Sequence, residues 1–229
     1  MSRGISTTGS LAVLLGAALV AGCGSHDTAS TPSSATSSGV PAPAAPATYD
    51  IGRIGAAKGA VPAGFDPTDV PADAVSQQNL DAPWVGGLSG AAPAVVTPAQ
   101  CAALLKPLGP VGVGARAQGF VGGQDGHMIV VIAAQSNTPA GAITAAGCDH
   151  FTVASPGSGS ISVDRLAGPP IPGVQTVGLR AQGSTAGKTM DESTYTAALG
   201  DRTIVVVQGD VDPAVAADVL GKAVAAVRG

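Results

Sequence analysis

Aromatic residues are scarce in this sequence, which has one Trp, two Tyr and three Phe among 229 residues. A hydrophobic core must therefore be built from Val, Ile, Leu and Ala. Charged residues are also few, with 11 Lys and Arg against 15 Asp and Glu. Such a weakly acidic chain has no basic face, which excludes nucleic acid as a partner. The length supports one ordinary domain.

A membrane-spanning apolar run is missing from the N-terminal region. Residues 11–20 are apolar but are interrupted by Gly16, and a transmembrane helix needs about 20 such residues. This run follows Arg3 and leads through small residues to Cys23, which predicts a secretory signal over residues 1–22 that ends in a lipobox. A transmembrane helix with an incidental cysteine is the alternative. We expect acyl chains on Cys23 to hold the protein on the outer face of the cytoplasmic membrane.

Cysteine is rare as well, with three residues in the whole chain. If Cys23 carries lipid, Cys101 and Cys148 remain as a pair in an oxidising compartment, which predicts a disulfide. A zinc site is the competing interpretation, with four candidate ligands: Cys101, Cys148, His127 and His150. Only residues 148–150 have close spacing, so we predict no metal site.

Composition divides the remainder of the chain into three parts. Residues 23–48 are rich in Ser, Thr, Pro and Ala, which predicts a disordered tether behind the lipidated cysteine. Residues 49–93 contain many Gly and Pro and predict irregular chain wrapped on the domain, with Trp84 as a core plug or a binding residue. Residues 94–229 carry the hydrophobic patterning of an α+β extracytoplasmic domain.

Periodicity predicts the elements of this domain. Three helices are expected, and each begins with a capping residue followed by proline: 97–106, 139–147 and the helix after Asp212. The expected strands, some of them joined as hairpins, are 113–121, 127–134, 151–154, 160–166, 174–182, 192–199 and 202–208. The elements predict an antiparallel sheet with two or three helices packed on one side.

A short sequence repeat occurs in both halves of the domain. Residues 114–119 read Gly-Ala-Arg-Ala-Gln-Gly, and residues 178–183 read Gly-Leu-Arg-Ala-Gln-Gly. Each copy precedes an apolar strand and a Pro-Ala helix start, which predicts a duplicated ββα unit. Chance similarity in a chain rich in Ala and Gly is the alternative.

Signatures of catalysis are also missing. Residues 183–189 resemble a phosphate-binding loop but have the wrong glycine spacing, and no serine lies in a Gly-x-Ser-x-Gly frame. Asp149-His150 and His127 are candidates for a general base, but no partnered nucleophile is evident. We therefore predict no catalytic residue and no cofactor. A hydrolase using His150 or His127 is the second hypothesis, and a lipid carrier or structural envelope protein is the third.

Several segments together resemble a known group of proteins. They are the lipobox, the tether, and the sequences Val-Val-Thr-Pro-Ala-Gln-Cys-Ala-Ala-Leu-Leu (95–105), Gly-Cys-Asp-His-Phe (147–151) and Ala-Ala-Leu-Gly-Asp-Arg-Thr-Ile-Val-Val-Val (197–207). In overall texture the chain resembles mycobacterial cell-envelope lipoproteins of the LprH type and, more distantly, the PknH-type extracellular sensor domain, an α+β domain with disulfides and a groove.

The resemblance implies an uncharacterised envelope domain without known catalytic residues. It carries over the lipidated Cys23 and the pairing of Cys101 with Cys148. The leading hypothesis is a lipid-anchored, non-enzymatic domain that binds a small ligand or an envelope protein, or acts as a sensor.

Overall fold

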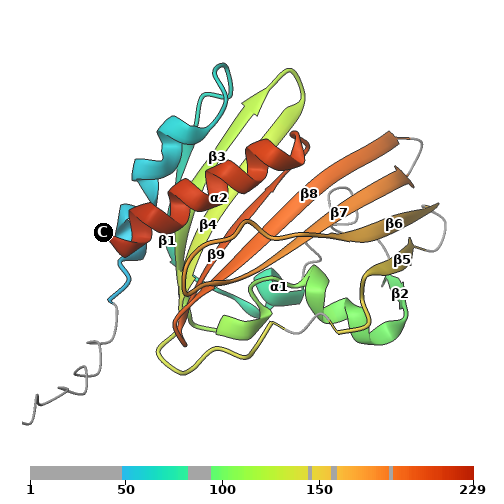
Figure 1. The fold of residues 1–229 in the computed structure, drawn as a ribbon, viewed down its shortest axis with the longest axis horizontal. Helices are drawn as coiled ribbons and strands as arrows, with labels where there is room; N and C mark the ends of the chain where they lie inside the picture. The colour runs from blue at the N-terminus through green and yellow to red at the C-terminus, as the bar shows by residue number, and fades with distance from the viewer. Residues whose placement is uncertain (1–47, 82–93, 144–145, 156–158, 186–187) are drawn as a thin grey trace, which may run out of the picture. The chain divides into compact units, whose positions relative to one another are not determined.

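The computed structural model describes residues 48–81, 94–143, 146–155, 159–185 and 188–229. Residues 45–229 form one compact unit. Its described part contains an antiparallel sheet with the strand order β1-β3-β4-β9-β8-β7-β6-β5-β2 (Figure 1). The strands are β1 (Thr68–Ala74), β2 (Val95–Thr97), β3 (Arg116–Gln124), β4 (His127–Gln135), β5 (His150–Ser155), β6 (Gly159–Leu166), β7 (Gln175–Thr185), β8 (Lys188–Leu199) and β9 (Thr203–Gly209).

Local sequence explains the hairpins of this sheet. The β3–β4 turn consists of Asp125 and Gly126, whose φ angles are 51° and 87°. Positive φ at both central residues is the requirement of a type I′ turn, and the twist of this turn matches the twist of the flanking strands. Strand β9, with the sequence Thr-Ile-Val-Val-Val-Gln-Gly, is buried along almost its whole length because it lies at the centre of the sheet and is covered on both faces.

One face of the sheet is covered by the helix α2 (Pro213–Arg228) and the 3-10 helix η1 (Ile51–Ala60), which run side by side (Figure 1). The side chain of Asp212 caps α2 by accepting a hydrogen bond from the Ala214 backbone N–H at 2.7 Å. An apolar stripe of α2 packs on β4, β8 and β9, where Tyr195, Ala197 and Leu199 point towards it. The buried stripe consists of Ala216, Val219, Leu220, Ala223, Val224 and Val227.

The opposite face is covered by shorter elements. They are the 3-10 helices η2 (Ala99–Leu105) and η3 (Gly109–Val111) and the short helix α1 (Gln77–Asp81). Leu104 and Leu105 of η2 belong to an apolar cluster with Val163 and Leu179, while Val111 of η3 packs with Val206 in a neighbouring cluster. Side chains alternate between the two faces of a strand, so each covering layer has its own set of apolar residues.

The α+β class and the antiparallel sheet are confirmed, but two of the expected helices differ from the structure: one is a shorter 3-10 helix, and the other is absent from the described residues. Thr97 is the last residue of β2, and the following helix is the 3-10 helix η2, which begins after Pro98 and has no side-chain cap. The second expected helix is absent from residues 139–143 and 146–147, which are irregular chain and a turn. Backbone hydrogen bonds from Ala140 to Asp201 and from Gly141 to Pro110 hold this segment against neighbouring loops instead.

The segment before residue 94 also differs from the irregular chain that its composition suggests. It supplies η1, which packs against α2, and β1, which pairs with β3 as an edge strand of the sheet. Strand β1 contains Pro71 and two aspartates and is mostly exposed. Proline is tolerated in a sheet at its edge, where one side of the strand has no partner. Trp84 and Cys23 lie outside the described residues.

The structure does not show the duplicated ββα unit. The first copy of the repeat, residues 114–119, runs into β3, which continues through a hairpin into β4, but no helix follows in residues 139–143. The second copy of the repeat lies in β7, and β8 lies between β7 and the apolar strand β9. The two copies therefore occupy different positions in the strand order.

Candidate functional site

A cavity of about 270 Å³ lies between the sheet and the loops that follow η2. Its floor is formed by Val177 and Leu179 of β7 and by Thr196 of β8. One wall comes from η2 and the chain after it: Ala103, Leu104, Lys106, Pro107, Gly109 and Pro110. The other wall is the segment Gly141, Ala142 and Ile143. The lining is predominantly apolar, which is typical of sites for small ligands.

Hydrogen bonds hold the second wall in place. The Gly141 backbone N–H donates to the Pro110 carbonyl at 2.9 Å, so the two walls are joined at one end. The side-chain amide of Gln175, at the start of β7, donates to the Ile143 carbonyl at 2.9 Å. The segment is thus attached both to the opposite wall and to the strand that forms the floor.

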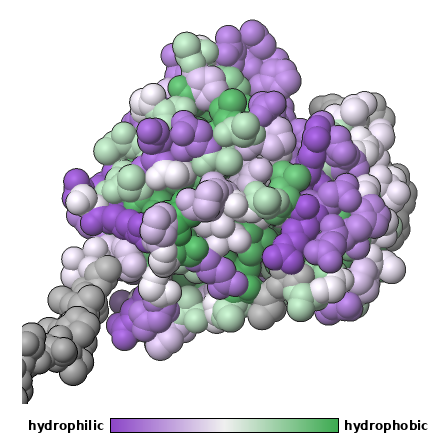
Figure 2. Space-filling view, viewed as in Figure 1, coloured by the Kyte–Doolittle hydropathy of each residue, from purple (hydrophilic) through white to green (hydrophobic). Residues whose placement is uncertain are grey.

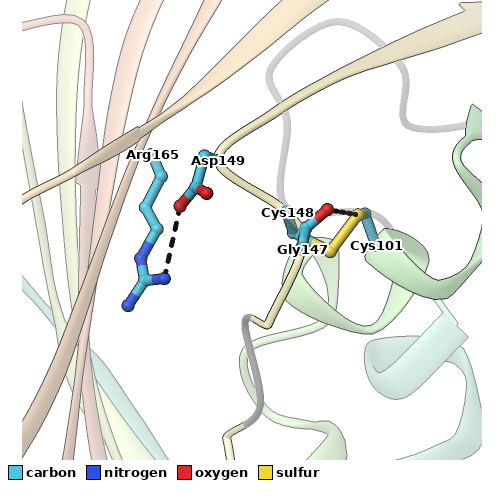
Figure 3. Close-up of a disulfide and its surroundings, with 5 residues drawn as sticks. All are labelled: Cys101, Gly147, Cys148, Asp149 and Arg165. Atoms are coloured by element: carbon cyan, nitrogen blue, oxygen red, sulfur yellow. Dashed lines mark hydrogen bonds and ion pairs between the residues drawn. A yellow bond between two sulfur atoms is a disulfide. The ribbon is translucent and has the colours of Figure 1, made fainter.

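A disulfide joins the chain just before the first wall to the chain that follows the second wall. Cys101 of η2 is bonded to Cys148, which follows the 141–143 segment, with the Cα atoms 5.6 Å apart (Figure 3). The exposed fractions of the two residues are 0% and 2%, so the bond is part of the core beneath η2. The Sγ of Cys101 lies 3.9 Å from the Gly147 carbonyl oxygen. This is a contact and no hydrogen bond, because an oxidised sulfur carries no hydrogen.

The histidines that the sequence offered as candidate bases lie far apart in the strand order. His127, at the start of β4, has Nδ1 3.0 Å from Oδ2 of Asp210, and His150, at the start of β5, has Nδ1 2.7 Å from Oδ1 of Asp164. Strands β9, β8, β7 and β6 stand between β4 and β5. The two histidines therefore belong to separate, exposed histidine–aspartate pairs and do not form one site.

Asp149 does not orient His150, its neighbour in sequence. Its carboxylate lies 3.5 Å from the guanidinium of Arg165 (Figure 3). Its carbonyl accepts a hydrogen bond from the Arg165 backbone N–H at 2.9 Å. Among the described residues, no group of three or more His, Cys, Asp or Glu could hold a metal ion. The cysteines of the zinc hypothesis are oxidised and are not available as thiolates.

A charged cluster lies on strands β7 and β8, on the same sheet face as α2. Arg180 of β7 donates two hydrogen bonds to Asp191 of β8, at 2.8 and 2.7 Å, and Gln182 donates a third at 3.1 Å. The bonds from Arg180, followed by the bond from Gln182, hold the pKa of Asp191 below its usual value despite partial burial. Figure 2 shows hydrophilic side chains gathered over this part of the sheet. Because Arg180 and Asp191 are paired with one another, this cluster forms a solvated polar surface and is not a binding site for an anion or a cation.

Two further hollows are lined by exposed turn residues. One lies at the turn of residues 200–202, beside Tyr49, and the other lies at the β3–β4 turn, residues 123–128. Their turn residues are glycines and polar side chains in contact with solvent. The cavity beneath η2 is the better ligand site, because apolar lining and nearby buried core residues remove a ligand from water.

Sequence reasoning did not identify this cavity. Its residues come from segments that are distant in the chain, and most are Ala, Gly, Pro and Leu, which carry no chemical signature. The near-phosphate loop at 183–189 falls in the β7–β8 hairpin, and residues 186 and 187 lie outside the described residues. Among the features of this cavity and its surroundings, the sequence indicated only the disulfide.

Comparisons with known proteins extend the fold assignment. A family model described as "Domain of unknown function (DUF5642)" matches residues 50–228. An X-ray structure of an uncharacterised Mycobacterium smegmatis protein, the Rv0999 ortholog, is 22% identical, with a TM-score of 0.64, and the match covers 81% of this chain and 100% of that chain. This likeness shows a shared fold.

The crystal structure of the extracellular domain of PknH from Mycobacterium tuberculosis is 12% identical, with a TM-score of 0.43, and covers 79% of this chain and 92% of that chain. No curated protein matches the sequence. In the described part of the chain, no helix combines the length and apolar character needed to cross a membrane.

Proposed function

Because this chain belongs to DUF5642, a family of unknown function, we propose a function from its own residues. The protein is a lipid-anchored cell-envelope lipoprotein whose extracytoplasmic domain binds a small apolar molecule without converting it. The ligand lies in the cavity beneath η2, against Val177 and Leu179. The anchor is Cys23, and the tether of residues 23–48 joins it to the domain.

The cavity carries this proposal. An apolar cavity of about 150 Å³ binds benzene, so by proportion a volume of 270 Å³ holds a molecule of about ten carbon atoms. A volume of this size does not hold a lipid with two long acyl chains. The proposal therefore favours a small ligand over the lipid-carrier alternative.

The arrangement of polar groups favours binding over catalysis. The cavity floor and walls contain no histidine, aspartate or glutamate among the described lining residues. The histidines pair with aspartates elsewhere on the sheet, at exposed positions. A hydrolase needs a nucleophile, a base and an orienting group together at a place where substrate is held.

The ligand site is tested with decan-1-ol, a neutral ten-carbon probe, on the full chain carrying Cys23→Ala, which has no lipidation site at residue 23. We expect decan-1-ol to raise the melting temperature of this protein in a saturable way, since a ligand stabilises the folded state that binds it. Ala103→Trp places a large side chain at the cavity wall from an exposed position and should abolish the shift.

The matched control is Ala154→Trp, the same substitution at an exposed position of β5 outside the cavity. It should leave the shift unchanged. A decan-1-ol shift that is absent from the parent protein, or equal in both tryptophan variants, refutes the ligand site.

The anchor is tested separately in mycobacterial cells. The unmodified chain should incorporate labelled palmitate and fractionate with membranes, and Cys23→Ala should lose both properties, because two acyl chains suffice for stable attachment. Membrane fractionation that persists in the variant contradicts the acyl anchor and leaves the ligand site unaffected.

A further inference from the structure

We propose that the molecule bound beneath η2 is an anionic amphiphile whose head group pairs with Lys106. This inference rests on the proposed ligand site and adds the chemical class of its ligand. An apolar chain of about ten carbon atoms would lie on the cavity floor, and a carboxylate-like head would lie at the cavity wall beside the ammonium group.

The positive charge of Lys106 favours a ligand that carries a negative charge. Of the described residues around the cavity, Lys106 is the one that carries a charge, and Thr196 is the one with a polar uncharged side chain. A lysine can lay its aliphatic stem along apolar surface and keep its ammonium group in water. Lys106 has both properties, since it lines the cavity while its side chain is 42% exposed. An apolar cavity with one cation at its wall complements a molecule with an apolar chain and one negative charge.

The present partner of Lys106 indicates how such a head would bind. Nζ of Lys106 lies 3.5 Å from Oδ1 of Asp81, at the end of α1, and the Asp81 side chain is 60% exposed. Exposed ion pairs of this kind contribute little free energy, so a ligand carboxylate can displace Asp81 at small cost. Asp81 thus lies where the proposed head group would bind.

Asp81 carries the negative charge that competes weakly with the ligand for Lys106 at neutral pH. The side-chain amide of Gln77 donates a hydrogen bond to its Oδ2 at 3.0 Å. That bond, together with the nearby Lys106 ammonium group, keeps the pKa of Asp81 below its usual value. The carboxylate is therefore ionised when the ligand arrives. Removing its charge should strengthen binding of an anion, whereas removing the Lys106 charge should weaken it.

These opposite effects distinguish two roles of Lys106: a direct contact with the ligand head group, and an ion pair that only holds α1 against η2. If the ion pair only holds α1 against η2, both substitutions disturb the cavity in the same direction and affect neutral and anionic ligands alike. If Lys106 binds the head, the two substitutions move anion affinity in opposite directions and leave a neutral ligand of equal length unaffected.

The experiment measures dissociation constants of sodium decanoate and decan-1-ol, below the micelle concentration, for the full chain carrying Cys23→Ala. Decanoate should bind more tightly than decan-1-ol. Lys106→Gln should weaken decanoate about two- to fivefold, the effect of one charge pair at a partly exposed site. Asp81→Asn should tighten decanoate severalfold, and neither substitution should alter decan-1-ol binding.

Lys222→Gln is the matched control, because it removes the same charge from an exposed position of α2 on the opposite sheet face. It should leave decanoate binding unchanged. Equal binding of both probes, with no effect of Lys106→Gln, overturns this inference while the ligand site stands. Failure of both probes to bind removes the ligand site and the inference together. An equal loss with Lys222→Gln shows a general charge effect and also overturns the inference.

Discussion

The disulfide beside the cavity should contribute much of the stability of the domain. Cys101 and Cys148 are separated by 47 residues. In the chain-entropy account, a cross-link that closes a loop of this length lowers the entropy of the unfolded chain by an amount worth about 4 kcal/mol at 25 °C. Replacing both cysteines by alanine removes this constraint and also leaves small voids, since both side chains are buried.

The expected change in melting temperature follows from the size of the domain. For a domain of 150 to 250 residues, 1 kcal/mol corresponds to about 2 to 4 °C. The double variant Cys101→Ala/Cys148→Ala should therefore melt about 8 to 16 °C lower than its parent. The slope of the urea dependence should increase as well, because the unfolded chain without the cross-link exposes more surface.

The assay is thermal and urea unfolding followed by circular dichroism, with Cys23→Ala in both proteins so that no third thiol can exchange. A reducing agent should lower the stability of the parent towards that of the double variant and should not affect the double variant. A decrease of less than about 4 °C, with an unchanged urea slope, would refute the loop-entropy argument. The same variant should lose most of the decan-1-ol shift, because the disulfide joins the chain just before the first cavity wall to the chain that follows the second.

Two further predictions concern the sheet. In urea unfolding, Asp191→Asn should lower stability at pH 7 and should lower it less at pH 2. The folded-state pKa of Asp191 is lowered, so its contribution is complete above the unfolded value of about 3.9 and decreases as pH falls towards and through the folded value. An equal deficit at both pH values would contradict this. Gly119→Ala should cost about 3 kcal/mol or more, because a Cβ there would lie 1.8 Å from the Val131 carbonyl oxygen. Gly59→Ala, which meets no atom within 4 Å, is the control and should unfold like the parent.

The elements that were predicted correctly have signals contained within a few neighbouring residues. Asp212 and Pro213 start α2 through a local hydrogen bond and a local φ restriction, so the sequence was sufficient to place this helix. Asp125-Gly126 similarly sets the β3–β4 turn. The expected helix over 139–147 began with the same kind of signal, but its first residues bond to Asp201 and Pro110, and these tertiary bonds outweighed a weak local preference.

The cavity could not be predicted for a related reason. Its floor and walls come from β7, β8, the chain after η2 and the segment 141–143, and they meet only because the sheet and the loops fold together. Lys106 illustrates this, since nothing in its immediate sequence distinguishes it from another surface lysine. Its place beside an apolar cavity and opposite Asp81 depends on contacts between residues far apart in the chain.

The sequence by itself determined the α+β class, the strands of the central sheet, the final helix and the pair of cysteines available for a disulfide. These features depend on alternation, turn chemistry and composition, which act over short distances along the chain. Only the tertiary structure decided the strand order, the inclusion of β1 in the sheet, the separation of the two histidines and the cavity beneath η2. Each of these depends on which distant segments pack together, and that is settled by burial of apolar surface over the whole domain rather than by any local pattern.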